Sequence, residues 1–239
     1  MIPLPRRTTA PMPPPDRAAL LKAALSLGVP LDAAQADRLL AYLALLHKWN
    51  RVINLTAVRD PAAMFTHHLL DCLAVVAPLR RQGAPRQFLD VGSGAGLPGL
   101  VIAAVMPDVA VTCVDAVEKK TAFIRQAAAE LGLSAVTALH NRVEAIEGRF
   151  DVVASRALTS LSDFVRTTRD RLTEDGVWLA MKGRTPNGEI AALSDDIDVF
   201  HVEPVTVPGL NAARCLVWMK PAWRARECDI ASASAPSPA

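Results

Sequence analysis

The feature that most constrains this chain is a glycine-rich stretch from Phe88 to Leu100, with the sequence FLDVGSGAGLPGL. It opens with a short apolar run typical of a buried strand, and Pro98 suits the first turn of a helix. Between them, Gly92, Gly94 and Gly96 give a turn its conformational freedom and let a ligand approach the backbone. The stretch predicts a strand, a glycine turn and a helix, an arrangement that binds nucleotide-containing cofactors. An ordinary strand-to-helix turn is the alternative.

The glycine spacing discriminates between cofactors. A dinucleotide fingerprint requires a further glycine at position 97, where this chain has Leu97, which disfavours a nicotinamide-dependent oxidoreductase. With Asp90 before the glycines, the motif resembles the S-adenosylmethionine (SAM) loop of class I methyltransferases. A second apolar strand ends at Asp115, 19 residues after Gly96, where a Rossmann-like unit places the carboxylate that binds ribose hydroxyls. Asp115 could instead cap the helix expected from Val117 to Leu131, and both roles can coexist.

Strands and helices alternate after residue 86, which predicts a mostly parallel α/β sheet covered on both faces. The expected strands are 88–91, 110–115, 135–139, 150–155, 176–182, about 198–207 and 214–220. Because the last two are joined by only a short segment, they must be antiparallel. An open, mostly parallel sheet with a C-terminal antiparallel hairpin is similar to the Rossmann-like fold of class I SAM-dependent methyltransferases.

The chain divides into four predicted regions. Residues 1–15 are a proline-rich disordered arm, 16–81 a helical region, 86–222 the SAM-binding domain and 223–239 a disordered tail of mostly small residues. Helix starts are marked by Asp16, by Asp32 with Gln35, and by Asp60 before a proline. These signals predict helices to about Leu27, through residues 36–46, and to about residue 76.

Composition favours a cytoplasmic protein. The sequence has no long uncharged apolar run and its start lacks the apolar segment of a secretory signal. Its four cysteines are widely separated, so neither a metal site nor a disulfide framework is expected. The net charge of +2 is too small to indicate a polyanionic partner by itself.

Several separated segments together resemble the bacterial glucose-inhibited division protein B family, whose members methylate N7 of a guanine in 16S (small-subunit) ribosomal RNA. The matching segments are Trp49-Asn50, Asn54 to Thr56, His68 to Asp71, Asp90 to Gly99, Val114-Asp115 with Lys119-Lys120, Arg142 to Glu144, Ser155 to Ala157, and Lys182-Gly183. Two departures are mild: Cys72 follows Asp71 where serine is common, and Lys120 replaces an arginine, which weakens any claim of a bidentate contact there.

The resemblance implies a set of site residues. It places SAM against Gly92, Gly94, Gly96 and Leu97, its ribose on Asp115, its adenine beside Val143 and Glu144, and its reactive end near Arg156. Arg156 and Lys182 are the candidates for positioning the substrate, Lys182 through a phosphate. The alternatives are a charged surface turn for residues 142–144, and plain strand-end cations for Arg156 and Lys182.

The reaction that the resemblance implies needs no general base, because guanine N7 carries an in-plane lone pair and is unprotonated at neutral pH. What it needs is alignment of N7 with the methyl group. The partner is then 16S ribosomal RNA or the small ribosomal subunit, with no membrane, and we expect a monomer. His68 and Asp71, three residues apart, could hydrogen-bond each other near the pocket or contact RNA. A methyltransferase of a small molecule or protein, or a non-catalytic SAM-binding regulator, remains an alternative.

Overall fold

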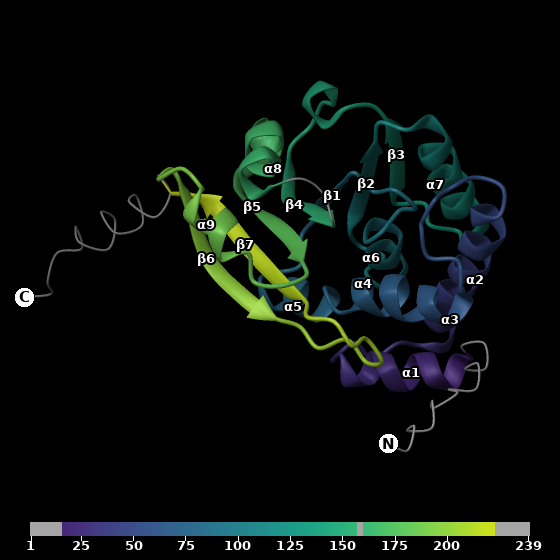
Figure 1. Cartoon of the computed structure of the whole chain (residues 1–239). Helices are drawn as coiled ribbons and strands as arrows, with labels where there is room; N and C mark the ends of the chain where they lie inside the picture. Colours follow the sequence, from purple (N-terminus) through teal and green to yellow (C-terminus); the bar gives the residue numbers. More distant parts are fainter. Residues whose placement is uncertain (1–15, 157–159, 223–239) are drawn as a thin grey trace, which may run out of the picture.

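A computed structural model of the 239-residue chain describes residues 16–156 and 160–222. Its strands form one seven-stranded sheet in the order β3-β2-β1-β4-β5-β7-β6 (Figure 1). The strands are β1 (Gln87–Val91), β2 (Ala110–Asp115), β3 (Val136–His140), β4 (Phe150–Arg156), β5 (Leu172–Lys182), β6 (Ile197–Pro204) and β7 (Cys215–Pro221). Strands β1 to β5 are parallel to one another, and β7 is antiparallel to both β5 and β6.

The sheet agrees with the expectation from sequence, including the terminal antiparallel hairpin and the bounds of β2. The largest difference is at β5, which starts at Leu172 rather than Gly176. The polar sequence from Thr173 to Asp175 does not predict a strand. In the structure Leu172 already pairs with Phe150, and regular pairing resumes at Val177 with Val152, so the polar residues lie at an irregularity in the register of β5. The predicted tails, 1–15 and 223–239, and Ala157 of the family pattern lie outside the described residues.

The helices begin where the capping signals place them. Asp16 accepts from the Ala19 amide, and Asp32 and Gln35 form a reciprocal capping box. The helical segments are α1 (Arg17–Ser26), α2 (Ala33–Asn50), α3 (Pro61–Met64), the π-helical η1 (Phe65–Leu70), α4 (Asp71–Leu73), α5 (Val76–Arg81), α6 (Gly99–Val105), α7 (Glu118–Glu130), η2 (Val143–Ala145), α8 (Leu161–Thr168), η3 (Arg169–Arg171) and α9 (Asn187–Ala191).

The helical segment from Pro61 to Arg81 runs past its expected end near Val76, because a turn at residues 74 and 75 is followed by α5. Its length and mean hydropathy of 1.4 would suit a bilayer, but 78% of its most apolar window is buried inside the protein. It is therefore accounted for as the core helix of a globular fold.

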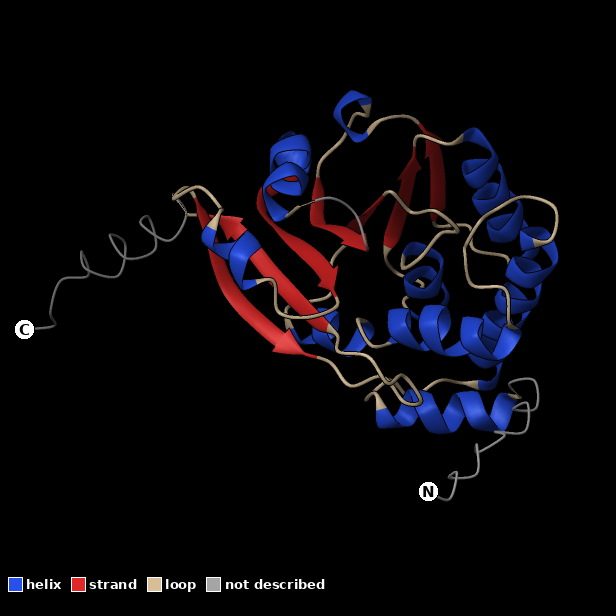
Figure 2. Cartoon of the chain, viewed as in Figure 1, coloured by secondary structure: helices blue, strands red, loops and turns tan. Residues whose placement is uncertain are grey.

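The two faces of the sheet carry two apolar clusters. One contains Phe88 and Val111 of the sheet together with α6, α7 and the helices of residues 17–81, including Leu20 and Leu69. The other lies on the opposite face of the sheet and contains Leu89 together with Phe164 and Val165 of α8. Figure 2 shows the first group of helices gathered along one side of the sheet, with α8 apart from it. The predicted helical region thus shares a core with the sheet.

Candidate active site

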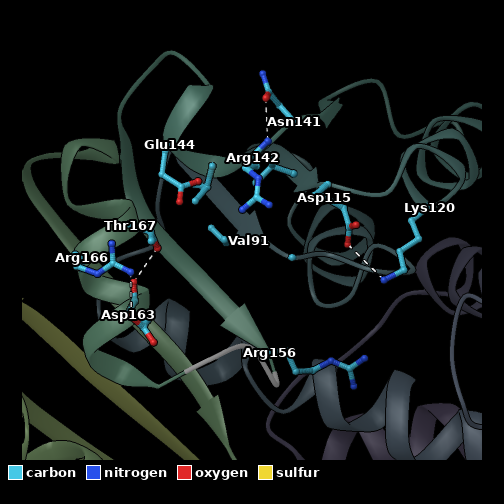
Figure 3. Close-up of a pocket in the computed structure, with 14 residues that line it drawn as sticks. Val91, Asp115, Lys120, Asn141, Arg142, Glu144, Arg156, Asp163, Arg166 and Thr167 are labelled. Carbon is cyan, nitrogen blue, oxygen red and sulfur yellow. Dashed lines mark hydrogen bonds and ion pairs between the residues drawn. The ribbon is translucent and has the colours of Figure 1, made fainter.

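A cavity of about 670 Å³ opens at the carboxyl ends of β1, β2 and β4 (Figure 3). This is where the strand order reverses, the usual ligand position in an open α/β sheet. The lining residues are Val91, Gly92, Val114, Asp115, Ala116, Lys120, Asn141, Arg142, Val143, Glu144, Arg156, Asp163, Arg166 and Thr167. Its volume falls within the range of small-molecule and cofactor sites.

The glycine turn gives this cavity one wall. Gly92, Gly94 and Gly96 all have positive φ, and a Cβ at Gly96 would lie 2.6 Å from Leu100 Cδ1. Glycine at 96 is therefore required both by backbone conformation and by close packing. Gly92 lines the cavity directly, while the side chain of Leu97 is buried and its amide donates to the Ser93 carbonyl. Contact of SAM with Leu97 stays a prediction, restricted by this burial.

Asp115 is engaged on both carboxylate oxygens. Oδ2 accepts from the Gly94 amide at 2.9 Å, and Oδ1 accepts from the Val117 amide at 2.9 Å, just before α7. Lys120 Nζ lies 3.9 Å from Oδ2. The carboxylate thus fixes the glycine turn and the residue before α7, but it does not cap the helix, because the N-cap is Val117 and makes no side-chain cap hydrogen bond. It also faces the cavity, and a carboxylate has further lone pairs for ribose hydroxyls.

Val143 and Glu144 also line the cavity, from the 3₁₀ turn η2 that follows β3. Val143 is buried and Glu144 is exposed. An apolar side chain beside a polar one suits the binding of a planar base. The adenine position beside Val143 and Glu144 stays a prediction.

Arg156 lies at the cavity end of β4, but its polar contacts are with the helices of residues 61–81. Its Nη1 donates to the His67 carbonyl at 3.1 Å and to Asp71 Oδ2 at 3.4 Å, and lies 3.4 Å from His68 Nδ1. In Figure 3 the side chain extends from the strand end toward those helices. Asp71 Oδ1 accepts from Arg214 Nε at 2.8 Å.

Of the two possibilities considered for His68 and Asp71, the hydrogen bond between them does not form; contact with RNA stays untested. His68 Nε2 pairs with Thr56 Oγ1 at 2.7 Å and its Nδ1 faces the His67 carbonyl, whereas Asp71 is held by two arginines. His68 lies in the π-helical segment η1, and Asp71 begins α4 directly after it. Arg156, at the end of β4, contacts the side chains of both His68 and Asp71.

Lys182, the other candidate for positioning substrate, does not line the cavity. Its Nζ donates to Glu189 Oε2 at 2.7 Å, and Glu189 also accepts from the Leu161 amide, which joins the end of β5 to α8 and α9. A phosphate contact by Lys182 stays a prediction, and it would compete with this ion pair.

Sequence reasoning missed the third wall of the cavity. Asp163, Arg166 and Thr167 of α8 line it, as does Asn141 after β3. These residues belong to no recognisable sequence motif. They reach the cavity because α8 packs on the face of the sheet formed by β4 and β5. Asp90, noted only as part of the glycine motif, is fully buried; its Oδ2 accepts from the Gly99 amide at 2.8 Å, and burial raises its pKa to about 6.

Comparison with known proteins decides the family. Residues 35–217 match the model of the GidB family, described as rRNA small subunit methyltransferase G. The chain belongs to this family. A ribosomal RNA small subunit methyltransferase G from Leptothrix cholodnii is 57% identical over 210 residues, covering 87% of this chain and 96% of its own. One from Acidovorax sp. (strain JS42) is 56% identical over 213 residues, covering 85% and 94%.

Membership in the small subunit methyltransferase G family confirms the resemblance found in the sequence and the class of enzyme, a methyltransferase of small-subunit ribosomal RNA. Solved methyltransferases confirm the fold. The magnesium protoporphyrin IX methyltransferase of Synechocystis PCC 6803, solved with bound SAM, has a TM-score of 0.56 at 14% identity, covering 75% of this chain and 97% of its own. TrmN from Thermus thermophilus has a TM-score of 0.51 at 21% identity, covering 63% and 48%.

Proposed function

We propose that this chain transfers a methyl group from SAM to N7 of a guanine in 16S ribosomal RNA. The observation that carries the proposal is the cavity lined by Gly92 of the glycine turn and by Asp115, at the switch point of the sheet, in a chain of the small subunit methyltransferase G family. The family supports RNA of the small subunit as substrate, and the choice of guanine N7 rests on the resemblance and on the chemistry below.

The residues around the cavity fit SAM. Asp115 has lone pairs left for ribose hydroxyls, Val143 offers an apolar surface to the adenine, and Gly92 leaves room for the ligand at the turn. When bound, SAM supplies a methyl group on a positively charged sulfur. The chain's task is then to hold the two reactants in line.

No residue of the cavity has to remove a proton if N7 is the acceptor. The lone pair of N7 takes the methyl group, and positive charge passes to the purine. A donor to guanine O6 would orient the base without occupying N7. Arg156, at the end of β4, is the residue proposed to make such a contact or one with a phosphate.

RNA capture would use cations that line the cavity and cations that are exposed elsewhere on the surface. Lys120, Arg142 and Arg166 line the cavity, and Arg51 and Arg59 are exposed on the loop between α2 and α3. Phosphate contacts of this kind supply sequence-independent affinity, so RNA binding should weaken as salt rises. A cytoplasmic monomer remains our expectation, and sedimentation of the purified chain tests its assembly state.

The direct test is incubation of the purified protein with methyl-labelled SAM and small-subunit RNA or subunits, followed by mass mapping of nucleosides. We expect the label on guanine N7 of 16S RNA. Label at an exocyclic nitrogen, on a ribose or on protein would reject the assignment. Tight SAM binding with no transfer to any RNA substrate would favour a regulator, and transfer only to a small molecule or protein would favour the other alternative.

The cofactor site is tested by Asp115→Asn, which keeps an oxygen for the Gly94 amide while removing the charge. SAM affinity measured by calorimetry should fall by about 1.5–3 kcal/mol, the value of a hydrogen bond to a charged group. The matched control is Asp108→Asn, an exposed aspartate before β2 that does not line the cavity. Unchanged affinity in Asp115→Asn would remove the ribose role.

A further inference from the structure

Asp71 is a buried carboxylate held between two arginines from distant parts of the chain. Only 5% of Asp71 is exposed; Oδ2 accepts from Arg156 Nη1 at 3.4 Å and Oδ1 from Arg214 Nε at 2.8 Å. Arg156 and Arg214 are 85 and 143 residues away from it in sequence. A buried carboxylate is costly unless its charge is compensated, so its orientation depends on both partners.

The shorter contact is the one to Arg214, which therefore does more to fix the carboxylate. Arg214 itself is held: Nη1 donates to the Ala213 carbonyl at 2.9 Å, and its own carbonyl accepts from the Val205 amide at 2.8 Å. The loop from β6 to β7 is anchored by Val207, which is buried in the same cluster as Leu69. In Figure 1 this loop reaches from the hairpin to the helices below the sheet.

Arg156 lines the cavity, whereas Arg214 does not. We propose that Arg214 is a positioning residue for methyl transfer, acting through Asp71 to set where the Arg156 guanidinium lies at the cavity. The inference rests on the proposed function, in which Arg156 contacts the substrate. It assigns the C-terminal hairpin a part in the reaction, although the hairpin lies outside the cavity.

Loss of Arg214 has a definite physical consequence. Without the Arg214 guanidinium, Arg156 is the one cation left of the two that contact the Asp71 carboxylate within the described residues. The carboxylate then turns toward Arg156 and draws its guanidinium away from the cavity. A displacement of about 1 Å in a positioning group can reduce a rate by about 100-fold. The glycine turn and Asp115 are not part of this network, so SAM binding should persist.

The experiment measures the single-turnover rate of methyl transfer at saturating SAM and RNA, alongside SAM affinity by calorimetry. Arg214→Met should lower the rate by about 10- to 100-fold and leave SAM affinity within about twofold of wild type. Arg214→Lys keeps a cation but loses the Nε contact, so it should fold and give an intermediate rate. Circular dichroism and thermal melts establish that each variant is folded at the assay temperature.

The matched control is Arg81→Met. Arg81 on α5 pairs with Glu203 on β6 at 2.6 Å, so it also joins the helices of residues 61–81 to the hairpin, without touching Asp71. Its side chain is 60% exposed, and its loss should leave the rate within about twofold of wild type. An equal loss of rate in Arg81→Met and Arg214→Met would show that only the attachment of the hairpin matters, which would overturn the proposal.

A double-mutant cycle separates positioning from general damage. If Arg214 acts through Arg156, adding Arg214→Met to Arg156→Ala should change the residual rate by less than about twofold. Independent, multiplicative losses would reject the mechanism, as would a parallel loss of SAM affinity. A wild-type protein that fails to methylate RNA would instead reject the proposed function, so the two failures are distinguishable.

Discussion

His68 is a buried histidine whose surroundings favour the neutral imidazole. Burial, followed by the nearby Arg156 cation, lowers its pKa to about 4 from an ordinary value of 6.5. Its Nε2 pairs with Thr56 Oγ1, so the ring also joins the loop between α2 and α3 to the residues around Arg156. A single side chain thus carries a pH-dependent part of the stability.

We predict that His68 makes the fold less stable in acid. The unfolded chain binds a proton at His68 below about pH 6.5, whereas the folded chain resists until about pH 4. Stability from the neutral ring is therefore present above pH 6.5 and lost progressively as pH falls to 4, by about 3 kcal/mol. Urea unfolding at several pH values should show this slope in wild type and a smaller slope in His68→Asn.

Asp90 changes the stability with pH in the opposite direction to His68. The contribution of His68 is therefore obtained from the difference between wild type and His68→Asn. Its pKa is raised to about 6, so burial of its charge costs stability increasingly as pH rises from about 4 to 6. His201→Asn, at a half-exposed position beside Glu203, is the control for loss of a histidine as such. Identical pH slopes in wild type and His68→Asn would refute the assignment to His68.

At the scale of elements, the loop between α2 and α3 is built on one amide side chain. Asn50 Oδ1 accepts from the amides of Leu55 and Thr56, both at 2.9 Å, and Nδ2 donates to the Val58 carbonyl at 3.1 Å. Trp49 beside it packs edge-on against Phe123 of α7, with ring centroids 5.9 Å apart. The Trp49-Asn50 pair is thus a packing and capping feature that holds the exposed loop.

We predict that Asn50→Ala lowers the free energy of unfolding by about 2–3 kcal/mol, because buried backbone groups lose their partners. Apparent RNA affinity should also weaken if Arg51 and Arg59 on this loop contact phosphates. Chemical denaturation and a filter-binding assay measure the two effects. Asn54→Ala is the control, since the exposed Asn54 accepts only a long 3.4 Å bond from Arg59 in the described contacts. Equal stability of both variants would contradict the role of Asn50.

Across the whole molecule, the helices of residues 17–81 share one apolar cluster with α6, α7 and one face of the sheet. Leu20, Leu39 and Leu69 are fully buried in the same cluster as sheet residues Phe88 and Val111. A fragment starting at Arg86 would uncover the apolar residues of α6, α7 and the sheet that belong to this cluster. The boundary between residues 81 and 86 is therefore a change of secondary structure within a shared core.

We predict that the fragment 86–222 does not fold cooperatively, whereas a chain starting at Asp16 unfolds like the full protein. The reason is the apolar area uncovered, since each fully buried leucine contributes about 1.5–3 kcal/mol. Near-ultraviolet circular dichroism and binding of a hydrophobic dye distinguish the two. A fragment 86–222 with a sharp thermal transition and SAM affinity equal to the full chain would refute the shared-core argument.

Local sequence patterns predicted the parts of the fold that depend on neighbouring residues. The capping residues Asp16 and Asp32, the glycine turn and the strand ending at Asp115 are local patterns, because backbone preferences and side-chain periodicity act over a few positions. The same patterns indicated a mostly parallel sheet with a C-terminal antiparallel hairpin, and separated motifs indicated the family. The family resemblance grouped Gly92, Asp115, Val143, Glu144 and Arg156, and the structure places all five around one cavity; their roles there stay predictions.

Contacts between side chains from distant parts of the chain could not be predicted from these local patterns. The pairing of Asp71 with Arg156 and Arg214, the position of α8 over the cavity, and the ion pair between Lys182 and Glu189 follow from how helices pack on each face of the sheet. The hydrogen bond considered between His68 and Asp71 does not form for this reason: spacing along a helix permits a pair, but Arg156 and Arg214 hold the Asp71 carboxylate instead. Partners separated by 85 and 143 residues leave no signal in local sequence, because the fold alone brings them within bonding distance.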